Sequence, residues 1–222
     1  PAPQTSGIAN YYQSSDMERR ICKLIGFAGA FQPEEIPDLP VKAILISGII
    51  AGEVNLPLLK LLAQRAPLGL DVQGFVRVPQ GEDLVFKPWP EMEAGLSTIT
   101  YLKCDQAEAE HLTGEADLRA AARKLAALGP KEILITRSEG PTVYVDGKFY
   151  TGRFTPRSLA GRTGRGDTCF SSYVGKRIQG ASPRQATLWS AAITTLKQEK
   201  PGPWSGSLAE AEALVKAMQK ED

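Results

Sequence analysis

Strand-like and helix-like segments alternate along most of this chain from residue 41 onward. Short, largely apolar runs predict strands at residues 41–50, 68–72, 97–103 and 132–136. Helical periodicity lies between them, at residues 56–65 and 116–128. Because parallel strands need a crossover connection, usually a helix, this order predicts an α/β fold with a largely parallel central sheet.

The start of the chain adds a hairpin to this pattern. Residues 7–13 and 19–27 have the composition of two strands around a polar turn at 14–18. A two-stranded ribbon is marginal alone in water, so it must lie on something. It is either an edge hairpin or a lid over a site.

The last third of the chain predicts a second hairpin and three helices. Asp146-Gly147 is a strong signal for a tight turn between strands at 142–146 and 148–154. Ser182 suits a helix N-cap, and Pro183 suits the first helical position after it. The helices are predicted at residues 167–178, 183–199 and 207–220.

The segment G-R-T-G-R-G-D-T-C-F, residues 161–170, opens the first of these helices. Glycine allows backbone conformations that point successive N–H groups into one hollow, and a helix start adds free donors and a positive dipole end. We therefore expect Gly164, Arg165 and Gly166 to form an anion hole. Asp167 beside it suits a base that accepts a proton from a hydroxyl attacking phosphorus. The alternative is a glycine-rich loop that only caps the helix.

Polar residues also follow the strand predicted at 68–72. Ligands in open α/β sheets gather at the carboxyl ends of strands. Asp71, Gln73 and Arg77 are therefore placed to meet a substrate. The alternative is a turn stabilised by a hydrogen bond from the Asp71 side chain to the backbone.

Two acidic residues mark the next helix start. Asp105 and Glu108 are three positions apart, so they share one helix face. They suit either an N-cap with its capping box or an outer-shell magnesium site, because Mg²⁺ keeps most of its waters. His111 is expected to be a half-buried helix residue rather than a ligand.

Composition excludes several classes of function. The 222 residues are 42% hydrophobic and carry a formal net charge of +1, which indicates neither a nucleic-acid nor a membrane-surface partner. Three widely spaced cysteines and one histidine form neither a disulfide framework nor a metal-ligand cluster. A reducing, cytoplasmic setting is the default expectation.

In this order, the segments resemble the ribokinase-like carbohydrate kinases, also called the PfkB family. G-R-G-D at 164–167 resembles the family's G-A-G-D signature. L-K-C-D-Q-A-E-A-E-H-L-T-G at 102–114 resembles its L-K-P-N-x-x-E segment with the following L-T-G, and I-T-R-S-E-G-P-T-V-Y-V-D-G at 135–147 resembles its nucleotide-side strand and hairpin. The resemblance spans residues 41–203.

Four stretches are most similar to the bacterial and archaeal inositol kinases of that family. They are D-V-Q-G-F-V-R-V-P, D-x-x-E-A-E, G-R-T-G-R-G-D-T-C and A-A-I-T-T-L-K-Q-E-K-P-G-P. The N-terminal hairpin resembles the family's substrate lid.

The resemblance implies a three-layer ribokinase-like sandwich with a small β lid, and ATP and Mg²⁺ as cofactors. It implies Asp167 as the catalytic base and Glu108, with Asp105, on the magnesium–water shell. The residues that it places along the nucleotide are Thr136, Ser138, Gly140, Ala192, Thr195 and Gly202.

Three positions depart from the family pattern. Asp105 replaces the usual Asn, which adds negative charge near the triphosphate. Gly161-Arg162 replaces the Asp-Thr that often opens the signature, which puts the family's monovalent-cation site in doubt. Arg165 replaces a small residue, and its side chain either reaches a phosphate or points to solvent.

The expected function is an ATP- and Mg²⁺-dependent kinase for a small polyol, a cyclitol such as myo-inositol first and a sugar second. The alternatives are a nucleoside kinase of the same fold and an inactive nucleotide-binding regulator. The intact Asp167 and both glycines argue against the regulator. The resemblance leaves open a homodimer formed through the lid.

We expect residues 1–30 to be part of the lid hairpin and residues 31–222 to form the α/β domain. The first recognisable element already resembles the lid, so the natural protein is expected to carry an additional N-terminal segment. By this argument the nucleotide half of the site is complete and the acceptor half is open. These 222 residues alone are then expected to bind nucleotide weakly and to lack kinase activity.

Overall fold

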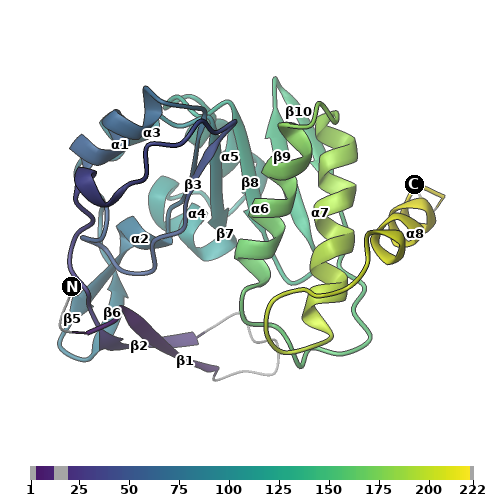
Figure 1. Cartoon of the computed structure of the whole chain (residues 1–222), viewed down its shortest axis with the longest axis horizontal. Coiled ribbons are helices and arrows are strands. Elements are labelled where there is room, and N and C mark those ends of the chain that lie inside the picture. The colour runs from purple at the N-terminus through teal and green to yellow at the C-terminus, as the bar shows by residue number, and fades with distance from the viewer. Residues whose placement is uncertain (1–3, 13–19, 221–222) are drawn as a thin grey trace. The chain divides into compact units, whose positions relative to one another are not determined.

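A computed structural model describes residues 4–12 and 20–220, in two compact units, residues 1–131 and 132–222 (Figure 1). In the first unit, three parallel strands have the order β7 (Tyr101–Asp105), β4 (Leu68–Asp71), β3 (Ile44–Ile46). Helices α1 (Leu56–Ala63) and α3 (Met92–Leu96) lie in the connections that lead to β4 and β7. The predicted alternation of parallel strands and helices is confirmed here.

Strand β3 is shorter than the predicted strand at 41–50. The carboxylate of Glu53 accepts the N–H groups of Ile49 at 2.7 Å and Ile50 at 3.2 Å, so the chain turns instead of extending the ladder. β3 is the last strand of its sheet, and an apolar cavity of about 400 Å³ beside it is lined in part by Ile46 and Leu58. The expectation of a further N-terminal segment stays a prediction.

A second, antiparallel sheet also belongs to the first unit. Its strands have the order β1 (Gly7–Tyr12), β2 (Arg20–Gly26), β6 (Asp83–Phe86), β5 (Arg77–Gln80). The N-terminal hairpin is therefore confirmed, while its predicted turn at 14–18 lies outside the described residues. Cys22, Leu84 and Ile50 form the buried cluster beneath this sheet.

The second unit contains the predicted C-terminal hairpin and helices. Its three antiparallel strands are β8 (Glu132–Thr136), β9 (Pro141–Val145) and β10 (Lys148–Thr151). Asp146 and Gly147 have φ values of 46° and 80°, as a tight hairpin turn requires. Figure 1 shows α6 (Arg165–Arg177) and α7 (Pro183–Gln198) side by side against these strands, followed by α8 (Leu208–Met218).

Helix caps agree with the sequence at several starts. The Ser182 hydroxyl accepts the N–H of Gln185 at 3.3 Å, with Pro183 in the first helical turn. The remaining helices are α2 (Gln73–Val76), α4 (Gln106–Thr113), α5 (Leu118–Ala126) and a 3-10 helix at Pro33–Glu35. Across residues 4–12 and 20–220, none of the helices has the length and apolar character needed to cross a bilayer.

Candidate active site

The predicted anion hole lies at the start of α6. Gly164 is the N-cap residue, and its left-handed backbone (φ 83°, ψ 11°) turns the chain into the helix at no steric penalty. The N–H groups of Gly166 and Asp167 lie in the first turn, where a helix provides no acceptor of its own. The N–H of Arg165 donates instead to the carbonyl of Arg162 at 3.1 Å. The N–H groups of Gly166 and Asp167 are therefore the helix-start amides placed to meet an anion, and the anion hole stays a prediction.

Asp167 lies beside these amides and is exposed. A Cβ built on Gly164 would lie 3.9 Å from Oδ2 of Asp167, so the carboxylate turns back toward the loop. The backbone carbonyl of Asp167 accepts the Ser171 hydroxyl at 2.7 Å, which keeps the first turn of α6 closed. The geometry suits a proton acceptor at the edge of an anion site, and this role stays a prediction.

Lys197, in the last turn of α7, also contacts this loop, and the sequence analysis missed it. Its side chain is buried, and its Nζ donates to the backbone carbonyl oxygens of Gly161 and Thr163. Burial lowers the pKa of Lys197, while the nearby negative charge of Asp167 acts in the opposite direction. A lysine near the end of the largely apolar run A-A-I-T-T-L-K is the signal that could have identified it.

Arg165 lies at the same helix start. Its guanidinium carbon is 6.0 Å from the ring centroid of Phe154, at the outer limit of a cation–π contact. The pKa of the Glu139 carboxyl is lowered, first by a backbone hydrogen bond and to a smaller extent by the charges of Arg137 and Arg165. The predicted reach of Arg165 toward a phosphate stays a prediction.

Most of the residues expected along a nucleotide are buried by packing within their unit. The Thr195 hydroxyl accepts the N–H of Thr155 at 3.1 Å. A Cβ on Gly140 would lie 2.0 Å from the carbonyl oxygen of Gly152, so this glycine is required by close packing. The buried members of the set are Thr136, Gly140, Ala192 and Thr195, and the exposed ones are Ser138 and Gly202.

In the first unit, a buried lysine joins the two predicted acidic sites. Nζ of Lys103 lies 2.8 Å from Oδ2 of Asp71 and 3.8 Å from Oε2 of Glu108. Oδ1 of Asp71 accepts the N–H of Gln73 at 3.1 Å, so the turn considered as the alternative for Asp71 does form. Strand β7 supplies Lys103 and strand β4 supplies Asp71, and these neighbouring parallel strands bring the charges together. Nothing in the sequence pattern predicts this role for Lys103.

Glu108 takes part in a helix cap and also has a buried carboxylate oxygen. Its Oε2 accepts the N–H of Asp105 at 2.7 Å, and Oδ1 of Asp105 accepts the N–H of Glu108 at 2.8 Å, so the predicted capping box is confirmed. Its Oε1 is buried without a hydrogen-bond partner among the described residues. Burial first, and then the charge of Asp105, raises the pKa of Glu108 to about 7, while Lys103 lowers it.

This arrangement fits a cation held through water. A buried carboxylate oxygen without a partner needs a proton, a water or a cation, and Mg²⁺ commonly retains waters between itself and a carboxylate. Among the residues that the structure describes, no three His, Cys, Asp or Glu side chains gather closely enough to hold a metal directly. Glu108, with Asp105, therefore remains the candidate for the water-mediated site.

The other residues predicted on the substrate side, Gln73 and Arg77, make separate contacts in the first unit. Nε2 of Gln73 donates to the carbonyl of Ile49 at 3.4 Å. The guanidinium carbon of Arg77 lies 4.0 Å from the ring centroid of Phe86, and the side chain is buried. His111 stacks on the same Phe86 ring with centroids 5.0 Å apart and is half-buried, as predicted.

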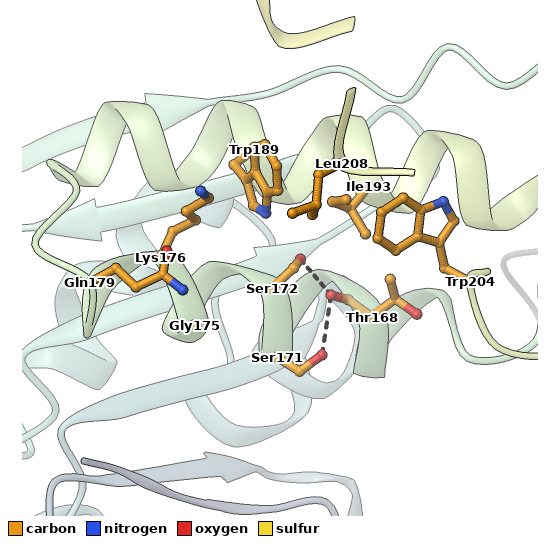
Figure 2. Close-up of a pocket in the computed structure, with 10 residues that line it drawn as sticks. All are labelled: Thr168, Ser171, Ser172, Gly175, Lys176, Gln179, Trp189, Ile193, Trp204 and Leu208. Atoms are coloured by element: carbon orange, nitrogen blue, oxygen red, sulfur yellow. Dashed lines mark hydrogen bonds between the residues drawn. The ribbon is translucent and has the colours of Figure 1, made fainter. Parts of the chain in front are cut away.

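The second unit also has a groove between α6 and α7 that the sequence did not predict (Figure 2). It has a volume of about 470 Å³, and its lining residues are Thr168, Ser171, Ser172, Gly175, Lys176, Gln179, Trp189, Ile193, Trp204 and Leu208. The Ser171 and Ser172 hydroxyls donate to backbone carbonyls of α6, and Nζ of Lys176 lies 3.9 Å from the Trp189 ring centroid. These three side chains are therefore engaged with the protein itself.

Comparisons with known proteins agree with these features. A family model described as pfkB family carbohydrate kinase matches residues 5–208. A solved sulfate complex of a pyrophosphate-dependent kinase in the ribokinase family is 38% identical, with a TM-score of 0.86 over 96% of this chain and 75% of that chain. A pyrophosphate-dependent kinase of that family, complexed with a pyrophosphate analog and myo-inositol, is 37% identical, with a TM-score of 0.85 over 96% and 74%.

A more distant structure shows how widely the fold is shared. Arabidopsis thaliana ribokinase, complexed with ribose and ATP, is 21% identical and has a TM-score of 0.71, with 96% of this chain and 69% of that chain covered. Among curated proteins, no match is found. The predicted ribokinase-like α/β fold class is confirmed by these matches.

Proposed function

Because this chain belongs to the pfkB family of carbohydrate kinases, we propose that it phosphorylates a hydroxyl of a cyclitol such as myo-inositol, with pyrophosphate as the first candidate donor. The observation that carries the proposal is the 36–38% identity to three structures described as pyrophosphate-dependent kinases, two of them named with myo-inositol or as myo-inositol kinases. A sugar is the second candidate acceptor.

The choice of donor changes the expectation drawn from the sequence alone. ATP was expected from family resemblance, and it remains the second candidate. Two observations favour pyrophosphate: the descriptions of the similar structures, and the burial of Ala192 and Thr195, which were expected to border an adenine. Pyrophosphate needs an anion site but no base-binding surface, so burial of these side chains would not affect its binding.

The residues at the start of α6 suit the chemistry of phosphoryl transfer. A substrate hydroxyl attacks the terminal phosphorus, its oxygen–phosphorus bond forms, and the bond to the leaving phosphate breaks. Asp167 accepts the hydroxyl proton, while the amides of Gly166 and Asp167 stabilise negative charge on the transferring group. General-base help of this kind is worth about 10²–10⁴ in rate.

Glu108 and Asp105 would hold Mg²⁺ through water in this proposal. The bound ion would neutralise charge on the phosphates of the donor. The chain's own contribution is a buried carboxylate fixed by the capping box, with Lys103 and Asp71 balancing the local charge.

A matrix of donors and acceptors tests the proposal. The full-length protein is incubated with pyrophosphate or ATP and with inositol isomers, ribose, fructose or adenosine, and thermal stabilisation and product formation are measured. Only a true ligand stabilises the fold by mass action. We expect pyrophosphate with myo-inositol to give the highest turnover. Phosphorylation of adenosine without any inositol isomer would instead support the nucleoside-kinase alternative, and binding without turnover would support the regulator.

A further inference from the structure

The Lys197 side chain is hydrogen-bonded to the loop that carries the predicted anion hole. Its Nζ donates to two backbone carbonyls within the three residues before Gly164, those of Gly161 and Thr163. A Cβ on Gly164 would lie 3.8 Å from this Nζ, so the charged group is next to the N-cap residue of α6. Lys197 is 4% exposed, and these acceptors are carbonyls rather than carboxylates.

The same loop is fixed to the end of α7 through its backbone. The N–H of Gly161 donates to the carbonyl of Gln198 at 2.7 Å. A Cβ on Gly161 would lie 1.8 Å from the carbonyl oxygen of Lys200 and 2.7 Å from that of Lys197. Any side chain at position 161 would therefore require the backbone to move, and this position cannot supply a carboxylate ligand to a bound ion.

A buried positive charge that donates to two backbone carbonyl oxygens resembles the environment that proteins provide for a monovalent cation. Potassium is bound in this way when carbonyl oxygens replace its hydration shell. A lysine ammonium has a compact charge and three donors, so it satisfies the same carbonyls without leaving the chain. With Lys197 in this position and Gly161 without a side chain, the residues here do not fit an added monovalent ion.

We propose that Lys197 is a positioning residue whose ammonium replaces a bound monovalent cation beneath the anion hole, so that activity does not require added potassium. This inference rests on the proposed function and adds to it that turnover is independent of an added monovalent cation. Lys197 acts through the loop: it fixes the carbonyls of Gly161 and Thr163, and thereby the direction of the amides that follow Gly164.

The first test is a cation series on the unmodified full-length protein. Turnover, and thermal stabilisation by inorganic pyrophosphate, are measured in potassium, sodium, ammonium and choline chloride at equal ionic strength. We expect the same values in all four salts. A marked requirement for potassium or ammonium would overturn the proposal, because the cation position would then not be filled by Lys197.

The second test removes the charge. Lys197→Met, and Lys197→Gln as a variant that keeps polar donors, are compared with Lys200→Met, which removes an exposed lysine from the same end of α7. We expect turnover of the Lys197 variants to fall by about 10², the loss typical of one anion-hole donor. Potassium or ammonium should restore it at least about tenfold, a gain equivalent to about 1.4 kcal/mol, whereas choline should not.

Each outcome of this second test decides the proposal. Folded Lys197 variants that are as active as Lys200→Met, or inactive and not rescued by any cation, would overturn it. If neither Lys197 variant folds, the cation series on the unmodified protein decides alone. If no donor and acceptor pair gives turnover, the proposed function fails, while stabilisation by pyrophosphate in the four salts still tests the role of Lys197.

Discussion

At the residue scale, each unit places charged side chains beside backbone groups or beside other charges. Asp167 lies beside helix-start amides, Lys197 beneath the same loop, and Lys103 between Asp71 and Glu108. Sequence reasoning identified the acidic members, because they lie in motifs with fixed spacing. It missed both lysines, because each lies in a run whose other residues indicate only burial. A lysine inside an apolar run indicates that its ammonium group has a hydrogen-bond or charge partner, but the run does not identify that partner.

Replacement of Asp167 by Asn should separate chemistry from binding. The amide has the shape of the carboxylate but cannot accept the proton of an attacking hydroxyl. We predict that turnover falls by about 10²–10⁴, while donor affinity changes little. Steady-state kinetics and donor titration measure the two quantities. Near-normal turnover of a folded Asp167→Asn variant would remove Asp167 from the role of base.

Replacement of Glu108 by Gln should change the pH dependence of stability. Glu108 has a pKa of about 7 in the folded protein, against an ordinary value of 4.5, chiefly because it is buried. The folded state therefore binds more protons between these values, so the stabilisation from this group is complete below pH 4.5 and is lost as the pH rises through 7. In metal-free buffer, the stability advantage of the unmodified protein over Glu108→Gln should shrink across this range.

Chemical unfolding at several pH values measures this difference, and Glu110→Gln, on the exposed side of the same helix, is the matched control. Parallel pH curves for the unmodified protein and Glu108→Gln would show that the folded pKa is not raised. The same variant should need more magnesium for half-maximal rate, because Glu108 is proposed to hold the ion through water. An unchanged magnesium titration would leave Glu108 with its capping role alone.

At the element scale, local signals predicted helices and tight turns better than strand limits. The Asp146-Gly147 turn and the Ser182 cap are confirmed, because each depends on a few neighbouring residues. The predicted strand at 97–103 begins only at Tyr101, since α3 and the turn after it use the preceding residues. The β5–β6 hairpin was missed, because its strands have four residues each and little alternation.

Two glycines of the second unit should respond in opposite ways to alanine. Gly161→Ala places a Cβ 1.8 Å from the carbonyl of Lys200, so the loop must shift and stability and turnover should both fall. Gly175→Ala, inside α6, meets no atom within 4 Å and should stabilise the protein by about 1 kcal/mol through helix propensity. Thermal unfolding measures both. Equal effects of the two substitutions would contradict the packing described for the 161–164 loop.

At the scale of the whole molecule, fold and enzyme class could be predicted from the sequence, whereas ATP as the donor is not confirmed. The order of the motifs identified the ribokinase-like fold, and the matches confirm it. Donor choice depends on which side chains remain accessible after packing. Ala192 and Thr195 are buried, as their largely apolar run indicates, but the run does not reveal that the Thr195 hydroxyl accepts the N–H of Thr155. The lid role, the homodimer and the additional N-terminal segment stay predictions.

Phosphorus NMR of one reaction mixture tests the central claim most directly. The full-length protein is mixed with pyrophosphate, Mg²⁺ and myo-inositol, and the phosphorus signals are followed over time. The account predicts that an inositol monophosphate and orthophosphate appear in equal amounts as pyrophosphate disappears. Orthophosphate alone, at two per pyrophosphate consumed, or no reaction with pyrophosphate while ATP yields the same monophosphate, would contradict it.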